Sequence, residues 1–458
     1  MNHIKFLLNR LYLIYNLGIV NIVRNLVHKI CLKAGYYKKR SPVDHEIKRY
    51  TPLIVIPEKK NKEVSPFEHL GKNFEKDVQG LLQGRIKMFF SQDVKFVDVP
   101  VWFSHAYGQD SSHWSKVKIN GIRGEDVKVT WDISRFHWMQ QLACAYIAYQ
   151  DKKFLELMNR WFLSWSRENP TNQGVNWACG QECSIRIIHI LNGSKIVKDL
   201  IFDKFVLAQV VKAHATRIQL TINYAISQDN NHGVTEAAAL FISGAWLLKN
   251  SDVPEVDAKK MMLTGKNILE NRVKKLVMKD GGFSMYSTNY HRVLLNTLSI
   301  VEMWRKEYDQ PEFSDSYIEQ CRAAISWLYL LVNESTGETI NLGTNDGSNP
   351  FIVQSADYRD YRASIQFASV LILNKRAYED CIAINEPLVW LNINFKLPLV
   401  KPCVIRSKVL NSSGIVALFG ADISPVETTV FVKYPNYIFR PGQSDALHVD
   451  LWHSGKNI

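Results

Sequence analysis

The 458-residue chain lacks the long apolar segments of membrane-spanning and exported proteins. No stretch approaches about 18 apolar residues without a charge, so the sequence predicts no transmembrane helix. Asn9, Arg10, Asn16 and Gly18 interrupt the apolar residues near the N-terminus, and no unbroken apolar core of a secretory signal remains. These absences leave the compartment unknown, with the cytoplasm as the default.

Residues 1–34 have the apolar spacing of an amphipathic helix that also carries many basic residues. Such a helix either lies on a membrane surface or packs on its own domain. We expect it to pack on the domain, with membrane-surface contact through residues 1–40 as the alternative.

Cysteine is scarce and irregularly spaced. Seven scattered cysteines, an odd number, predict buried free thiols and no disulfide framework. Cys179 and Cys183 have the i, i+4 spacing of one helix face, but no second cysteine pair accompanies them. We therefore predict neither a metal site nor a cofactor there.

Proline and glycine are also sparse, and 46% of the residues are hydrophobic, as in a globular protein with room for one large and one small domain. The 56 Lys and Arg residues against 44 Asp and Glu residues give a net charge of +12, which favours an anionic partner. Because the basic residues are dispersed and no nucleic-acid-binding module is present, we expect no nucleic acid and an acidic polysaccharide instead.

From residue 131 onward, apolar residues recur with the 3.6-residue period of helices. The predicted helices span 131–149, 153–167, 181–195, 204–226, 234–249, 259–277, 291–305, 314–332 and 361–373. Their short polar links predict stacked helical hairpins. β-Branched residues then predict strands at 428–434 and 446–452. We expect a basic helix and mixed α/β lead-in over 1–120, a helical domain over 121–390 and a β part over 391–458.

The run Gln228-Asp229-Asn230-Asn231-His232-Gly233 directly precedes a predicted helix. An amide and an imidazole beside the free N–H groups of a helix start are suited to holding a carboxylate. The alternative is that Asn231 merely caps the helix.

A series of short motifs, taken in order, resembles the heparinase II/III-like polysaccharide lyases. These motifs are Asp126-Val-Lys-Val-Thr-Trp-Asp-Ile-Ser-Arg135, Asn169-Pro170, Gly174-Val-Asn-Trp177, Glu182-Cys-Ser-Ile-Arg186, Asn230-Asn-His232, Asp280-Gly-Gly-Phe283, Tyr290-His-Arg292, Asn345-Asp-Gly347 and Asp445-Ala-Leu-His-Val-Asp-Leu-Trp452. The resemblance runs from about Asp126 to the last residue. It implies an α/α toroid followed by an antiparallel β-sandwich, and lyase chemistry on a uronic-acid-containing glycan, either glycosaminoglycan or alginate-like.

Cleavage of a uronate by β-elimination needs a group that neutralises the carboxylate, a base and an acid. The resemblance implies that Asn231 and His232 neutralise the carboxylate. It assigns Tyr290 as base, acid or both, and His448 as a third catalytic group. We expect Asn231, His232 and Tyr290 to converge on one cleft.

Neighbouring motif residues are predicted to bind substrate. Trp177 would stack on a sugar, Arg186 would orient a carboxylate near Glu182, and Arg292 beside His291 would supply a positive field for Tyr290. Two alternatives stay open: Glu182 and Arg186 form only a surface ion pair, or Tyr290 is only a half-buried aromatic residue.

A glycoside hydrolase on the same toroid is a second hypothesis, with Asp280, Asp346 and Glu236 as available carboxylates. Asp280 and Asp346 lie in Gly-containing turns, where Asp is favoured for its own backbone bonding. A third hypothesis is an inactive or truncated relative that binds an acidic polysaccharide.

The C-terminal segment departs from the family pattern. Gln443 and Ser444 stand where some relatives carry catalytic or metal-binding histidines, so we expect no structural divalent metal here. The sequence ends at Gly455-Lys-Asn-Ile458, which predicts an incomplete sandwich with an unpaired edge, an exposed apolar face and weak or no lyase activity.

Overall fold

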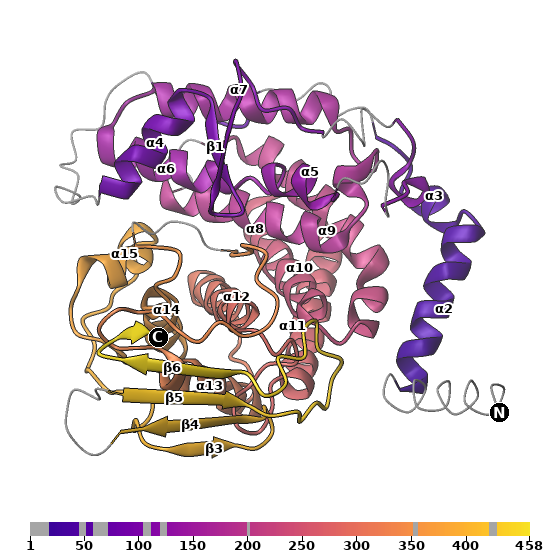
Figure 1. The fold of residues 1–458 in the computed structure, drawn as a ribbon. Coiled ribbons are helices and arrows are strands. Elements are labelled where there is room, and N and C mark those ends of the chain that lie inside the picture. The colour runs from indigo at the N-terminus through magenta and orange to yellow at the C-terminus, as the bar shows by residue number, and fades with distance from the viewer. Residues whose placement is uncertain are drawn as a thin grey trace.

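The computed structural model describes residues 18–44, 52–57, 72–103, 111–119, 126–198, 202–350, 356–420 and 428–458. Helices make up most of this part of the chain, and a sheet follows them at the C-terminal end (Figure 1). This order confirms the predicted mainly helical class with a C-terminal antiparallel β part.

Helices α6 to α15 form the toroid. Their bounds are α6 His137–Tyr149, α7 Lys153–Glu168, α8 Gly180–Ile196, α9 Lys204–Ser227, α10 Asn231–Asn250, α11 Glu255–Leu276, α12 Thr288–Glu307, α13 Asp315–Leu331, α14 Arg362–Leu373 and α15 Ile382–Trp390. Each even-numbered helix pairs with the helix that follows it. The even-numbered helices also pack on one another in chain order, so they form the inner row and the others cover it.

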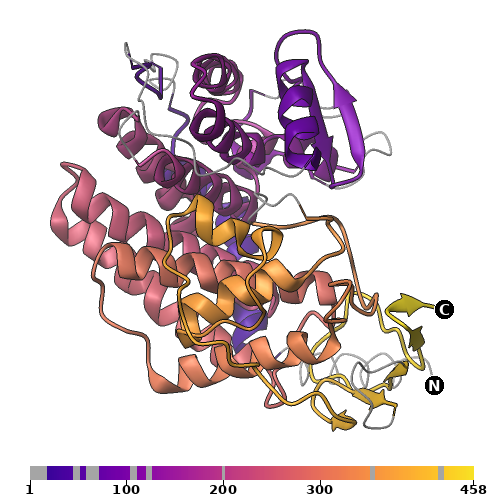
Figure 2. The same ribbon diagram turned by 90° about the vertical axis from the view of Figure 1, so that its left-hand side faces the viewer.

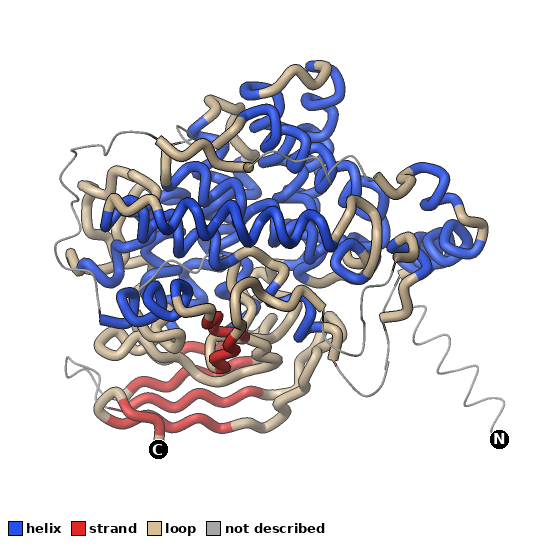
Figure 3. The backbone as a smooth tube through the Cα atoms, turned by 90° about the horizontal axis from the view of Figure 1, so that it is seen from above, coloured by secondary structure: helices blue, strands red, loops and turns tan. Residues whose placement is uncertain are grey.

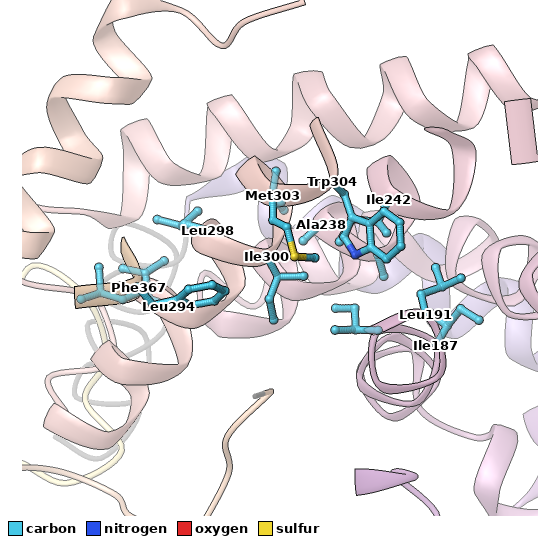
Figure 4. Close-up of a cluster of buried hydrophobic side chains, with 14 of the residues drawn as sticks. Ile187, Leu191, Ala238, Ile242, Leu294, Leu298, Ile300, Met303, Trp304 and Phe367 are labelled. Atoms are coloured by element: carbon cyan, nitrogen blue, oxygen red, sulfur yellow. The ribbon is translucent and has the colours of Figure 1, made fainter. Parts of the chain in front are cut away.

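The amino-acid composition of a helix decides whether it can lie in the inner row, because a helix that is apolar on all sides must be covered on all sides. Helix α10 is buried around almost its whole circumference. The Ile242 side chain of α10 lies in one hydrophobic core with Leu191 of α8 and Trp304 of α12 (Figure 4). A Cβ atom on Gly265 of α11 would lie 2.4 Å from the backbone N of Phe241, so glycine permits the close approach of α10 and α11.

Several predicted helix boundaries were wrong, and two of these differences have a clear local cause. The helix predicted over 131–149 is broken, because α5 (Lys128–Ile133) ends and Phe136 takes a φ of 64° before α6 begins. Helix α10 begins at Asn231 instead of residue 234, because Asn230 already caps it.

The elements before the toroid are short. They are α2 Ile19–Lys33, α3 Tyr36–Arg40, α4 Lys72–Leu82, β1 Arg85–Met88, β2 Gln92–Lys95 and the 3₁₀ turns η2 Trp114–Lys116 and η3 Val175–Trp177. Helix α2 packs on α9, while residues 1–17 of the predicted N-terminal helix lie outside the described residues. None of the described helices has the length and apolar character needed to cross a bilayer.

The C-terminal sheet is antiparallel, with its strands in chain order (Figure 1). It lies at one side of the helices (Figures 2 and 3). The strands are β3 Lys408–Leu410, β4 Ile415–Phe419, β5 Thr428–Lys433, β6 Val449–His453 and β7 Lys456–Asn457. Strand β6 begins three residues later than predicted, after Asp445 and Leu447 take positive φ angles.

One face of the sheet is buried and carries Ile415, Phe431 and Trp452. Trp327 of α13 donates a hydrogen bond of 3.0 Å to Ser413 in the turn between β3 and β4. The opposite face exposes aliphatic side chains, among them Leu418 and Val449. Helix α13 therefore joins the sheet to the toroid.

Candidate active site

The loop before α10 is held rigidly. The Asn230 side chain accepts a hydrogen bond of 3.0 Å from the backbone N–H of His232, so Asn230 is the cap. Asp229, with a φ of 48°, accepts hydrogen bonds of 2.8 Å from Arg272 and Lys275 of α11. The interpretation of Asn231 as a mere cap was therefore wrong, and Asn231 is the first residue of the helix.

The imidazole of His232 lies between a thiol and a carboxylate. Its Nδ1 atom is 3.7 Å from Oε1 of Glu236, and its ring also contacts the half-buried Cys179. Burial alone would lower the pKa of His232, but hydrogen bonds to Cys179 and Glu236 outweigh it and raise the pKa to about 10. With 26% of its side chain exposed, His232 is an accessible cation at neutral pH.

Tyr290 lies in the first turn of α12, where the Ser287 hydroxyl caps the helix by accepting from the Tyr290 N–H at 3.1 Å. The Tyr290 hydroxyl donates a hydrogen bond of 2.9 Å to Oδ2 of Asp346, to which Lys128 also donates at 3.2 Å. Burial and the Asp346 charge both raise the pKa of Tyr290. In the resting protein Tyr290 therefore holds its proton.

Arg135, and not Arg292, is the buried cation beside this pair, in addition to the more exposed Lys128. Arg135 donates two hydrogen bonds, of 2.7 and 2.9 Å, to the carboxylate of Glu182 and a third, of 3.2 Å, to Asp132. All three side chains are buried. The charge of Arg135 opposes burial and lowers the pKa of Asp346, which keeps Asp346 ionised.

The first turn of α8 connects the His232–Glu236 pair with the Tyr290–Asp346 pair. Cys179, the residue before this helix, contacts His232, and a Cβ atom on Gly180 would lie 2.5 Å from Oε2 of Glu236. Two residues later, Glu182 binds Arg135 beside Tyr290 and Asp346. Both pairs thus lie at the start of α8. Their convergence on a single cleft stays a prediction.

Two predicted sugar-binding residues of the α8 region are inaccessible. The ring of Trp177 is 1% exposed and its Nε1 donates to the Asn169 carbonyl oxygen at 3.1 Å, so it cannot stack on a sugar in this structure. Arg186 is fully buried, donates to the carbonyl oxygens of Ser134 and Asn176, and lies over the ring of Trp165. Glu182 pairs with Arg135 and not with Arg186, so neither reading of the i, i+4 pair was right.

His291 and Arg292 are buried as well. The His291 ring stacks on Trp327 with centroids 4.4 Å apart, and its Nε2 contacts the Ala324 carbonyl oxygen at 2.9 Å. The Arg292 guanidinium lies between the rings of Tyr358 and Tyr361. Both residues therefore hold α12 against its neighbouring segments and support the fold of this helix.

His448 falls within the strand predicted over 446–452, but it lies just before β6. Its Nε2 is 3.6 Å from Oδ2 of the buried Asp450. Asp450 lines a cavity of about 320 Å³ between toroid and sheet, together with Thr288, Asn345 and Tyr358. Asp450, the partner of His448, therefore borders the same cavity as Thr288, the first residue of α12.

A second cavity, of about 210 Å³, is lined in part by residues of α6 and α8. Asp132, Arg135, His189 and Tyr358 line it, and Tyr358 borders both cavities. The turn that carries Asp346 thus has a polar cavity near each side.

Comparisons with known proteins decide the family. The family described as Heparinase II/III N-terminus matches residues 32–354, about 70% of the chain. The chain belongs to the heparinase II/III family. A heparin-sulfate lyase of Pedobacter heparinus is 25% identical over 209 residues, which are 43% of this chain and 30% of that enzyme.

Solved heparinase structures share the fold. A heparinase III crystal structure aligns with a TM-score of 0.53 at 14% identity, over 90% of this chain and 61% of that one. A heparinase III with methylated lysines aligns with a TM-score of 0.50 at 16% identity, over 95% of this chain and 61% of that one. This heparinase II/III family member therefore spans less than two thirds of the length of these relatives.

Three groups at the site were not predicted in their present roles. Asp346 appeared to be a turn residue, and it does accept from the Ser348 N–H, but it also binds Tyr290. Arg135 was visible only as a motif residue. The pairing of His232 with Glu236 has the i, i+4 spacing of one helix face and could have been found from the sequence.

Replacing Glu236 with glutamine should lower the pKa of His232 by roughly one to three units, because an opposite charge is removed. NMR titration of the imidazole measures this, with the distant Glu255→Gln as the control. Because the folded pKa of about 10 exceeds the ordinary histidine value of 6.5, the pairing stabilises the fold fully below pH 6.5 and this contribution is lost as the pH rises through 10. A pKa that stays near 10 in the variant would show that Glu236 does not hold the proton.

Proposed function

We propose that this heparinase II/III family member cleaves a uronic-acid-containing polysaccharide by β-elimination. The observation that carries the proposal is the hydrogen bond from the protonated Tyr290 to Asp346. The first turn of α8 separates this pair from the cation His232. A uronate carboxylate held by His232 and Asn231 loses its charge, which makes the proton on C5 more acidic.

In the proposed reaction Tyr290 relays protons. Its oxygen takes the C5 proton while its own proton moves to Asp346. The C4–O bond then breaks, the C4=C5 double bond forms, and Tyr290 gives a proton to the leaving oxygen as Asp346 returns one. The relay avoids a free phenolate, which agrees with the raised pKa of Tyr290.

The surroundings of the carboxylates favour this reaction over hydrolysis. Asp280 accepts hydrogen bonds from the backbone and side chain of Ser413, Glu236 contacts His232, and Asp346 accepts from Tyr290. Each of these three carboxylates thus already has its own partner, and the three partners differ. A hydrolase needs two carboxyl groups that flank one bond.

The substrate class follows from charge and from the relatives. The net charge of +12 favours an anionic polymer, and a heparin-sulfate lyase is among the proteins similar to this chain. We therefore propose a glycosaminoglycan of the heparan sulfate type as the first substrate to test, with alginate as the comparison polymer.

Prolonged incubation of the chain with each polymer tests the function. Elimination leaves an unsaturated uronate that absorbs in the ultraviolet, while hydrolysis leaves none. We expect absorbing product, and we expect none from the same polymer after its carboxyl groups are reduced to alcohols. New reducing ends without ultraviolet absorption would instead identify a hydrolase.

A further inference from the structure

Helix α2 exposes a broad apolar stripe along one side. Residues at positions 19, 20, 23, 26, 27 and 30 fall within a roughly 120° arc of the helix. Each is more than half exposed: Ile19, Val20, Val23, Leu26, Val27 and Ile30. Exposed aliphatic side chains gathered on one face mark a contact surface.

The opposite side of α2 already holds the helix to the protein. Asn21 donates a hydrogen bond of 2.6 Å to Asp229, in the loop before α10. The His28 ring stacks on Tyr224 of α9 with centroids 4.1 Å apart, and its Nδ1 contacts the Tyr37 hydroxyl at 2.8 Å. Helix α2 is thus packed on the domain, as expected, and lies at the edge of the molecule (Figure 1). The apolar stripe on its other side stays exposed.

Positive charge borders this stripe. Residues 19–40 contain six cations and no Asp or Glu: Arg24, Lys29, Lys33, Lys38, Lys39 and Arg40. On the helix, Lys29 and Lys33 flank one edge of the stripe and Arg24 the other. Tyr36, at the start of α3, is also exposed at 48%.

We propose that α2 and α3 form a docking surface for an anionic lipid bilayer. An apolar stripe with basic borders lies in the plane of a membrane, its aliphatic side chains among the acyl chains and its cations at the head groups. A second copy of the chain would bring two sets of cations together, and an acidic polysaccharide offers nothing apolar for the stripe. The contact is peripheral, because the helix lies on the bilayer surface.

Vesicle co-flotation with the full chain tests the proposal. One vesicle set is pure phosphatidylcholine, and the other has equal parts of phosphatidylcholine and phosphatidylglycerol. We expect binding to the anionic set and a loss of roughly tenfold or more in the double variant Val23→Asp/Ile30→Asp. The control variant Val256→Asp/Leu263→Asp alters exposed aliphatic residues of α11 and should bind as the unchanged chain does.

A second variant tests the charge. Lys29→Gln/Lys33→Gln should weaken binding to the anionic vesicles by roughly tenfold or more and reduce its dependence on salt. No binding of the unchanged chain, or equal binding of the chain and the Val23→Asp/Ile30→Asp variant, would overturn the proposal. So would a lipid-free dimer that this variant dissociates, which identifies a second copy as the occupant. If deleting residues 1–17 creates the binding, those residues cover the stripe and the proposal fails for the full chain.

Discussion

Replacing Tyr290 with phenylalanine is expected to lower turnover of a uronate polymer by roughly 100- to 10,000-fold, the usual contribution of a positioned proton-transfer group. The ring and its packing stay, but the proton shared with Asp346 is gone. Polymer binding should change little, because His232 and Asn231 keep their places. Kinetics of ultraviolet-absorbing product and equilibrium binding of the polymer measure the two effects separately.

The Asp346→Asn variant tests the relay itself. The amide oxygen can still accept the Tyr290 hydrogen bond, but it cannot take the proton. We expect a loss similar to that of Tyr290→Phe, and a double variant no worse than either single one, because residues of one relay act as a unit. Tyr149→Phe, at an exposed end of α6, is the matched control. Equal losses of binding and turnover in Tyr290→Phe would show that Tyr290 only supports the cleft.

Replacing Arg135 with methionine should lower the free energy of unfolding by about 3–5 kcal/mol. The guanidinium is buried between Glu182 and Asp132, and its removal leaves two buried carboxylates without their cation. Burial lowers the pKa of Arg135, but Glu182 and Asp132 outweigh it and raise that pKa, so the charge is stabilised by its partners. Chemical denaturation of the variant measures the loss.

Arg160→Met is the control for this prediction. Its ion pair with Asp98, at 3.6 Å, is more than half exposed, and such pairs contribute about 0–1 kcal/mol. Similar losses in both variants would contradict the view that the Arg135 network stabilises the junction of α5, α6 and α8.

The periodicity of the sequence predicted the helical hairpins because each helix buries a continuous apolar stripe. It could not predict the break before α6, since the apolar period of 131–149 continues across Phe136. Nor could it predict which motif residues reach solvent. Helices α8 and α12 are covered on almost every side, so Arg186 and Arg292 are buried although their neighbours in sequence reach the site.

The candidate site was predictable where function depends on a helix start. Asn231 and Tyr290 both follow Ser or Asn caps that are visible in the sequence. The partner of Tyr290 was not, because Asp346 lies 56 residues away and reads as an ordinary turn residue. His448 fell within the predicted strand 446–452, but β6 begins only after the positive φ angles of Asp445 and Leu447.

Mass spectrometry of products formed in water labelled with heavy oxygen tests the central claim most directly. β-Elimination breaks the C4–O bond without adding water, so the account predicts unlabelled products whose new nonreducing end is lighter by one water. Tyr290→Phe should remove these products at equal protein concentration. Labelled, saturated products, or no cleavage of heparan sulfate and alginate even at stoichiometric protein, would contradict it.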